Sequence, residues 1–417
     1  MKGKKPICWL CCWVILMCRA AFCTASDSVI PAKGSIESQP NSPTPQDSTT
    51  QATDKLRHEY LQLFQHGDYE AIIDRLTPLL HKSSPPDSGL AYVHGLTSRI
   101  IGDLDTAATD LAPLGNYAPD SDASTWFSWP PASAIWQQVQ FRRQLFPAHL
   151  KVLHDGETLR FNVYYDDMTD WTRDALSVLP RAYAANHDFL GQDFSTITVL
   201  LFNDYGHFTD YVRATRWDVV PPKYAHGIGS LEALCISRYN GYHQDWPALS
   251  SKYSCATVAH EMNHSLVERM IAGYGLPRWF MEGLAVDLQT RITPEDVPTF
   301  GRLIRQLVRQ GGILSLDDLT YHFGDSVQVY AGESTQELER WRNSNAYQQG
   351  YSMVNYFLRK LKPGDLPHFL TDLREQRYTD KSARSRQIFD QQTHKYLGLS
   401  LDEFYTDWQS FVQRIYK

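Results

Sequence analysis

The stretch His260-Glu261-Met262-Asn263-His264 lies within residues 255–272, a segment that contains neither proline nor glycine. Apolar residues recur at helical spacing on both sides of it, so the sequence predicts a helix. Residues four apart share one face of a helix, which lets His260 and His264 point toward a common centre. Glu261 lies one position further round and reaches the same region from the side. The stretch therefore predicts a helix that presents two imidazoles and one carboxylate together.

A second segment, Pro277-Arg278-Trp279-Phe280-Met281-Glu282-Gly283, follows a break that contains two glycines. Proline is favoured in the first turn of a helix, which places Glu282 about a turn and a half inside a new helix. Two neutral imidazoles and one carboxylate are typical ligands of a hydrolytic zinc site. We therefore predict that His260, His264 and Glu282 bind one Zn2+. Glu261 is predicted to take the proton from the attacking water as the general base.

The spacing of these motifs distinguishes between classes of zinc peptidase. A metzincin carries glycine three residues and histidine six residues after the second ligand, where this chain has Val267 and Met270. A glutamate ligand 18 positions beyond the second histidine is the gluzincin arrangement. Residues 258–264 and 277–286 resemble the peptidase MA-like family, which is related to the gluzincin aminopeptidases. The resemblance covers residues 148–415 and implies a thermolysin-like domain that hydrolyses peptide or protein substrates.

The resemblance also implies a tyrosine, on a later helix, that stabilises the oxyanion. Asn345-Ala346-Tyr347-Gln348-Gln349-Gly350-Tyr351 resembles that setting, and Tyr347 lies 65 positions beyond Glu282. A phenol donor aimed at the developing charge contributes about a hundredfold or more in rate. Tyr347 is the expected donor, Tyr351 is the alternative donor, and simple packing is the alternative role of Tyr347. Gly350 is expected to let this helix approach the zinc helix closely.

The chain departs from the aminopeptidase pattern before the zinc helix. Those enzymes hold the amino terminus of the substrate with a Gly-x-Met-Glu-Asn motif, and nothing similar occurs in residues 225–240. Aminopeptidase specificity is therefore not implied. Glu232 either takes that part or is a solvent-facing carboxylate, and we expect the latter. Asp287 either holds an imidazole N–H behind the metal or is an exposed helix residue, and we again expect the latter.

Residues 1–23 have the pattern of a signal peptide. Residues 1–5 carry three lysines, residues 7–18 form an apolar run, and small residues follow. The run is too short to span a bilayer as a stable helix. We expect an exported protein, periplasmic or extracellular, without a stable transmembrane anchor. Lipid attachment at Cys23 is the alternative, which Phe22 disfavours because a lipobox requires a small residue there.

Five of the seven cysteines lie in this leader, so Cys235 and Cys255 remain in the mature chain. In an oxidising compartment they form either a disulfide, which would tie the strand before the zinc helix to its start, or two buried free thiols. The leader contains four basic and no acidic residues, so its removal changes the net charge from −7 to −11. Such an acidic chain has no electrostatic attraction for nucleic acid or anionic membranes.

Residues 24–52 are rich in Ser, Thr, Pro and Gln and are predicted to be a disordered linker. Residues 53–121 have a helical pattern that contains two related units 35 residues apart, Gly67-Asp68-Tyr69-Glu70-Ala71-Ile72 and Gly102-Asp103-Leu104-Asp105-Thr106-Ala107. This spacing resembles tetratricopeptide (TPR) repeats. Two repeats are fewer than usually stand alone, so we expect the helical unit to dock on its neighbour. Its role is either to bind a protein partner or only to pack.

Strand-like segments at residues 159–165, 196–202 and 234–239, with a helix over 169–190, precede the zinc helix. Strands first and helices afterwards predict an α+β fold with a small mixed sheet, a helical C-terminal part and all-α TPR-like helices in front. The alternative function is a catalytically inactive scaffold that binds a protein partner around a structural or vestigial metal site. Retention of Glu261, and the lack of a fourth Cys or His in either motif, favour catalysis.

Overall fold

The computed structural model describes residues 59–60, 62–64, 68–82, 86–118, 130–146, 148–154, 158–194, 196–215, 226–239, 252–271, 276–321, 335–379 and 385–416. The predicted signal peptide, linker and Cys23 lie outside these residues. Within them, no helix has the length and apolar character needed to cross a membrane.

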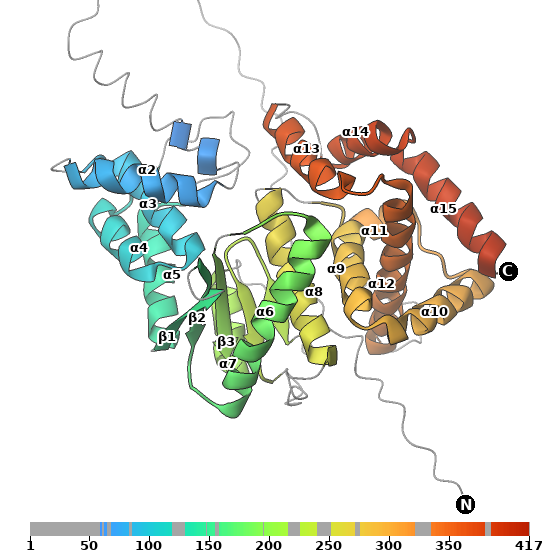
Figure 1. Ribbon diagram of the computed structural model, residues 1–417, viewed down its shortest axis with the longest axis horizontal. Coiled ribbons are helices and arrows are strands. Elements are labelled where there is room, and N and C mark those ends of the chain that lie inside the picture. Colours follow the sequence, from blue (N-terminus) through green and yellow to red (C-terminus); the bar gives the residue numbers. More distant parts are fainter. Residues whose placement is uncertain are drawn as a thin grey trace, which may run out of the picture.

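Within its described residues, the N-terminal part forms helices (Figure 1). Its elements are α2 (Tyr69–Lys82), α3 (Ser88–Ile101), α4 (Leu104–Leu111), the short 3-10 helix η2 (Ala112–Leu114) and α5 (Ala132–Leu145). Both α2 and α4 begin directly after a Gly-Asp pair of the sequence repeat, and Asp103 caps α4 by accepting a hydrogen bond from the Thr106 N–H at 3.1 Å. The repeat therefore corresponds to two helix starts. Helix α5 extends the unit beyond the predicted range 53–121.

The sheet has five strands in the order β1-β2-β3-β5-β4. β1 (Ala148–His154) is antiparallel to β2 (Thr158–Tyr165), β2 is parallel to β3 (Ile197–Phe202), β3 is parallel to β5 (Leu234–Ser237), and β4 (Gly227–Gly229) is antiparallel to β5. The predicted strands correspond to β2, β3 and β5, whereas β1 and β4 were not predicted. The predicted α+β class with a small mixed sheet is confirmed.

The sheet is the middle layer of the molecule. Side chains on a strand point alternately to the two faces of the sheet, and here each face packs against a separate core. Val199 and Leu201 of β3 face one core, which contains α6 (Asp170–Leu190), α8 (Lys252–Met270) and α9 (Arg278–Ile292). Leu200 and Phe202 face the other core, which contains the N-terminal helices and α7 (Tyr205–Thr215). A strand that is buried on both faces is typical of parallel pairing. Figure 1 shows the N-terminal helices and the C-terminal helices on opposite sides of the sheet.

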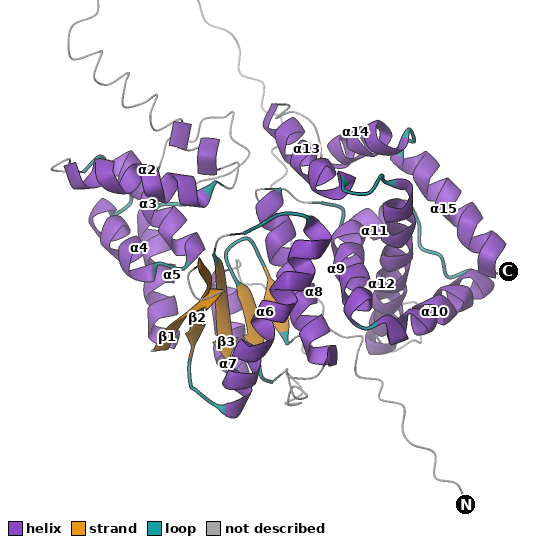
Figure 2. Ribbon diagram, in the orientation of Figure 1, coloured by secondary structure: helices purple, strands orange, loops and turns teal. Residues whose placement is uncertain are grey.

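Within its described residues, the C-terminal part consists of helices joined by loops (Figure 2). Its elements are η3 (Pro294–Asp296), α10 (Val297–Gln310), α11 (Leu316–Tyr321), α12 (Thr335–Lys360), α13 (Asp365–Thr379), α14 (Ser385–Leu397) and α15 (Leu401–Tyr416). Trp279 and Phe280 at the start of α9 are fully buried against Phe357, Phe389 and Phe404 from this part. This aromatic core fixes α9, and with it Glu282, against the C-terminal helices.

The turn that ends α3 docks on the sheet. Three side chains of β2 and β3 donate hydrogen bonds to consecutive main-chain carbonyls there: Thr198 to Ile100 (3.0 Å), Asn162 to Ile101 (3.2 Å) and Tyr164 to Gly102. Gly102 has a φ of 85°, and a Cβ at this position would lie 2.7 Å from the Thr198 hydroxyl oxygen. Only glycine fits this contact. The helical unit therefore docks on its neighbour, as its small number of repeats predicts.

Of the two alternatives left open for Cys235 and Cys255, the structure has two buried free thiols and no disulfide between them. Cys235 of β5 belongs to the core shared with the N-terminal helices, whereas its neighbours Leu234 and Ile236 belong to the core that contains Cys255. The two thiols therefore lie on opposite sides of the sheet. Burial raises the pKa of the Cys255 thiol, which disfavours the reactive thiolate.

Candidate metal centre

Helix α8 brings the two predicted histidine ligands together inside the protein. The Nε2 atoms of His260 and His264 lie 3.2 Å apart, and both side chains are buried. The helix is fixed to α6 by an amide pair, in which Asn263 donates to Asn186 at 3.0 Å and Asn186 donates to the Ala259 carbonyl at 2.9 Å. The orientation of the imidazoles therefore depends on a buried polar contact as well as on apolar packing.

Glu282 of α9 completes the group. Its Oε2 atom lies 3.6 Å from Nε2 of His260 and 3.3 Å from Nε2 of His264. A tetrahedral zinc ion with bonds of about 2.1 Å separates its ligand atoms by about 3.4 Å. The three observed separations, 3.2, 3.3 and 3.6 Å, match that value. The buried triad of His260, His264 and Glu282 could therefore hold a metal ion, and its donor set fits zinc.

The surroundings of Glu282 keep it ionised. Burial by itself raises the pKa of this carboxyl, but the neighbouring imidazoles of His264 and His260 and the charge of Arg278 together hold it well below its usual range. Arg278 lies one turn earlier in α9, with its Nε atom 3.7 Å from the other carboxylate oxygen, Oε1. Glu282 is therefore available as an anionic ligand.

Glu261 is buried beside the triad and is oriented by the main chain of β4. Its Oε2 atom accepts a hydrogen bond from the Gly229 N–H at 3.1 Å. A Cβ on Gly229 would lie 2.0 Å from the Glu261 carbonyl oxygen, and one on Gly227 would lie 3.0 Å from the Glu261 side chain. Only glycines allow β4 to pass so close to α8. This role of Gly229 was not predicted, although the Gly227-Ile228-Gly229 pattern is a signal of close backbone approach.

Helix α12 crosses α9 at a glycine contact next to the ligand Glu282. A Cβ on Gly283 would lie 2.4 Å from a methyl group of Val354, and one on Gly350 would lie 2.8 Å from the Trp279 carbonyl oxygen. Gly350 thus allows a close approach, as predicted, but the neighbour is α9 instead of the zinc helix α8. The crossing brings the helix that carries Tyr347 against the helix that carries the third ligand.

Tyr347 lies on α12 in a half-buried position, and its hydroxyl oxygen is buried. It packs against a small cluster formed by Val286, Phe300 and Tyr351. Val286 follows Glu282 by one turn, so these two residues share a face of α9. The Tyr351 hydroxyl instead bonds to Thr290, and burial raises the pKa of Tyr351. Since Thr290 lies eight residues after Glu282, about 12 Å along the helix axis separates the two residues.

Two further acidic residues are expected from the sequence to be exposed. Asp287 is buried and accepts hydrogen bonds from Arg291 and Asn355, both at 2.9 Å, so it ties α9 to α12 and its described partners include no imidazole. Glu232 is half-buried and paired with Arg99 of α3. The expectation of an exposed residue is therefore wrong at Asp287, whereas the Glu232 carboxylate is partly exposed and paired with an arginine.

No protein-family model matches this chain, and no curated protein matches it significantly. Within the described residues, His260, His264 and Glu282 are the group of histidine and acidic side chains that could hold a metal ion.

Proposed function

We propose that this protein is an exported zinc-dependent peptidase of the gluzincin type. The observation that carries the proposal is the convergence of His260, His264 and Glu282 from two helices at tetrahedral spacing. When bound, Zn2+ would lower the pKa of a water molecule to about 7 and polarise a substrate carbonyl. Among the described residues, no fourth Cys, His or carboxylate joins this group, which is typical of catalytic and not of structural zinc.

Glu261 supplies the proton transfer in this proposal. It sits next to His260 on the ligand helix, and the Gly229 N–H fixes the direction of its carboxylate. From there it takes a proton from the attacking water and delivers it to the leaving amine. An inactive scaffold has no use for a buried, oriented carboxylate at this position, because burying it costs free energy. The retained Glu261 therefore supports the peptidase over the scaffold.

Strand β4 supports an extended peptide as the substrate. It is the last strand of the described sheet order, and it passes directly beside Glu261. An extended chain binds to such an edge through main-chain hydrogen bonds, which are largely independent of sequence. A peptide held along β4 would bring a scissile bond past the metal ligands.

The same proposal includes a thermolysin-like domain, TPR-like helices and export of the protein. The arrangement of α8, α9 and the sheet supports a thermolysin-like domain, and the two helix starts of the repeat support TPR-like helices. Export follows from the leader pattern of residues 1–23, and the acidic net charge argues against a nucleic-acid partner.

Removal of the metal tests the proposal. The purified full chain is expected to contain one zinc ion per molecule and to hydrolyse a denatured protein mixture. A chelator should abolish hydrolysis, and added Zn2+ should restore it, because the ligands fix the ion that activates water. Metal content is measured by elemental analysis, and hydrolysis by the release of new amino termini. A protein that lacks zinc, or one that is insensitive to the chelator, would contradict the proposal.

Tyr347→Phe is expected to lower kcat about a hundredfold with little change in KM or zinc content, because the lost hydrogen bond forms mainly in the transition state. Steady-state kinetics and metal analysis check this result. Tyr351→Phe is the matched control, since it removes a hydroxyl one turn later on α12 that bonds to Thr290. Full activity of Tyr347→Phe would exclude the oxyanion role, and a large loss in Tyr351→Phe would transfer it.

A further inference from the structure

The connection between β4 and β5, residues 230–233, is attached to one face of α8. Four side chains of α8 bond its main chain or the adjoining Gly229: Glu261 to the Gly229 N–H (3.1 Å), Ser265 to the Ser230 N–H (2.9 Å), Glu268 to the Leu231 N–H (2.6 Å) and Arg269 to the Leu231 carbonyl (3.4 Å). Positions 261, 265, 268 and 269 recur at helical spacing and so lie along one face. The orientation of Glu261 is therefore part of a longer contact between α8 and this connection.

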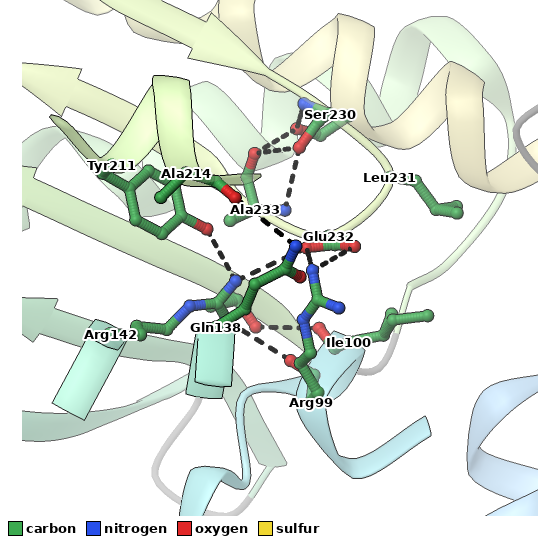
Figure 3. Close-up of polar contacts among 12 residues, drawn as sticks. Arg99, Ile100, Gln138, Arg142, Tyr211, Ala214, Ser230, Leu231, Glu232 and Ala233 are labelled. Atoms are coloured by element: carbon green, nitrogen blue, oxygen red, sulfur yellow. Dashed lines mark hydrogen bonds and ion pairs between the residues drawn. The ribbon is translucent and has the colours of Figure 1, made fainter. Parts of the chain in front are cut away.

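The opposite side of the connection is held by the N-terminal helices through Glu232 (Figure 3). Nη2 of Arg99 on α3 donates to both carboxylate oxygens of Glu232, at 2.7 and 2.5 Å. Nη2 of Arg142 on α5 lies 3.5 Å from the same carboxylate and donates to the Tyr211 hydroxyl at 2.6 Å. The Arg99 and Arg142 side chains are 5% and 1% exposed, and Glu232 is 29% exposed. We call Arg99, Arg142 and Glu232 the arginine clasp.

The arginine clasp buries charged side chains, which is costly in free energy for a contact that only packs two parts together. Two buried guanidinium groups lie near the same carboxylate, and Arg142 also donates to the main-chain carbonyl of Arg99 at 3.3 Å. Two like charges in a poorly solvated place require an anion close by, and Glu232 supplies it. Because the Glu232 carboxylate is engaged by Arg99, it is not available to hold the amino terminus of a substrate.

Strand β4, which carries the Gly229 N–H that donates to Glu261, needs external support. β4 has three residues, two of which are glycines, and it lies at the end of the described sheet order. Glycine loses more conformational freedom on ordering than any other residue, so a short glycine-rich strand has little intrinsic order. The Gly229 N–H is three residues from Glu232 in the chain and donates to Glu261. Fixing Glu232 therefore restricts the group that orients the general base.

We propose that Glu232 is a positioning residue of the catalytic centre: held by Arg99 and Arg142, it fixes the β4–β5 connection on α8 and, through Gly229, orients Glu261. The catalytic part of this inference rests on the proposed peptidase function. It gives the N-terminal helical unit a role in the chemistry, because two of its helices supply the groups that hold the connection.

The test uses the full chain loaded with Zn2+ and compares Glu232→Gln with Tyr164→Phe. Glu232→Gln removes the single negative charge of the arginine clasp while keeping the side-chain length. Tyr164→Phe removes a different hydrogen bond between the helical unit and the sheet, the one to Gly102, and leaves the connection untouched. Hydrogen exchange of the amides of residues 229–233 reports on the connection, and kcat, KM and zinc content report on the site.

Glu232→Gln is expected to speed exchange in residues 229–233 about tenfold or more and to lower kcat about tenfold, with KM within about twofold and zinc content unchanged. Arg99→Gln should reproduce both effects, and the double variant should add little, because the two residues act as one unit. Tyr164→Phe should change neither the exchange rate of residues 229–233 nor kcat.

Unchanged exchange in residues 229–233 of Glu232→Gln and Arg99→Gln would overturn the inference, as would an equal effect of Tyr164→Phe. Faster exchange with an undiminished kcat would overturn the positioning role. If the wild-type protein hydrolyses no peptide while Glu232→Gln still loosens the connection, the peptidase proposal fails and the fixing of the connection by the arginine clasp is supported.

Discussion

Glu261→Gln is expected to lower kcat by about 10²–10⁴-fold while one zinc ion stays bound to each chain. The amide cannot accept the proton of the attacking water, so the general-base contribution is lost. Its oxygen can still accept the hydrogen bond from the Gly229 N–H, which keeps the local geometry and isolates the effect on chemistry. Steady-state kinetics on a denatured protein mixture, together with elemental analysis of the same sample, measures both quantities.

The matched control for Glu261→Gln is Asp188→Asn, which neutralises an exposed carboxylate on α6 and should leave kcat unchanged. Retained hydrolysis in Glu261→Gln would mean that the activity is not generated at this site. Loss of zinc from Glu261→Gln would show instead that Glu261 acts as a metal ligand. It would then contradict the assignment of Glu261 as a general base that does not bind the metal.

Glu282→Gln is expected to weaken zinc binding by a hundredfold or more and to remove activity with it, since changes even behind the ligands of a zinc site cost about 10–100-fold in affinity. The substitution replaces the single anionic ligand by a neutral amide, while His260 and His264 remain in place. Competition with a chromophoric chelator gives the zinc dissociation constant, and activity is followed across the same zinc concentrations.

For Glu282→Gln the control is Glu295→Gln, an exposed carboxylate just beyond α9 whose neutralisation should leave zinc affinity unchanged. Activity of Glu282→Gln that recovers at high zinc concentration would support the ligand role. Unaltered zinc affinity in this variant would contradict it, and with it the assignment of the triad.

The convergence of the three candidate metal ligands was predictable because it depends on local sequence signals. His260 and His264 lie one turn apart on a segment without helix breakers, and Glu282 follows a helix start marked by Pro277. Both helices appear where the motifs predict them, and tertiary packing only has to bring two neighbouring helices together. The long strands β2 and β3 were predictable for the same reason, since their apolar runs are strong local signals.

Features that depend on distant parts of the chain were not predictable. Arg99 and Glu232 are separated by 133 positions, and no local pattern indicates that they pair. The face of Cys235 depends on the register of β5, where a shift by one residue would turn the thiol to the other core. β4 has too few residues for any periodic pattern, and it forms because β5 and α8 lie beside it.

The end of α3 has a consequence for how the chain folds. A helix leaves its last carbonyls without partners inside the helix, and here Thr198, Asn162 and Tyr164 supply the donors. These donors lie 61 to 98 positions later in the chain, so they leave the ribosome after the helices that need them. The N-terminal helices therefore reach their full stability only when β2 and β3 have been made. The two parts should then unfold together in one cooperative transition, instead of melting as separate domains.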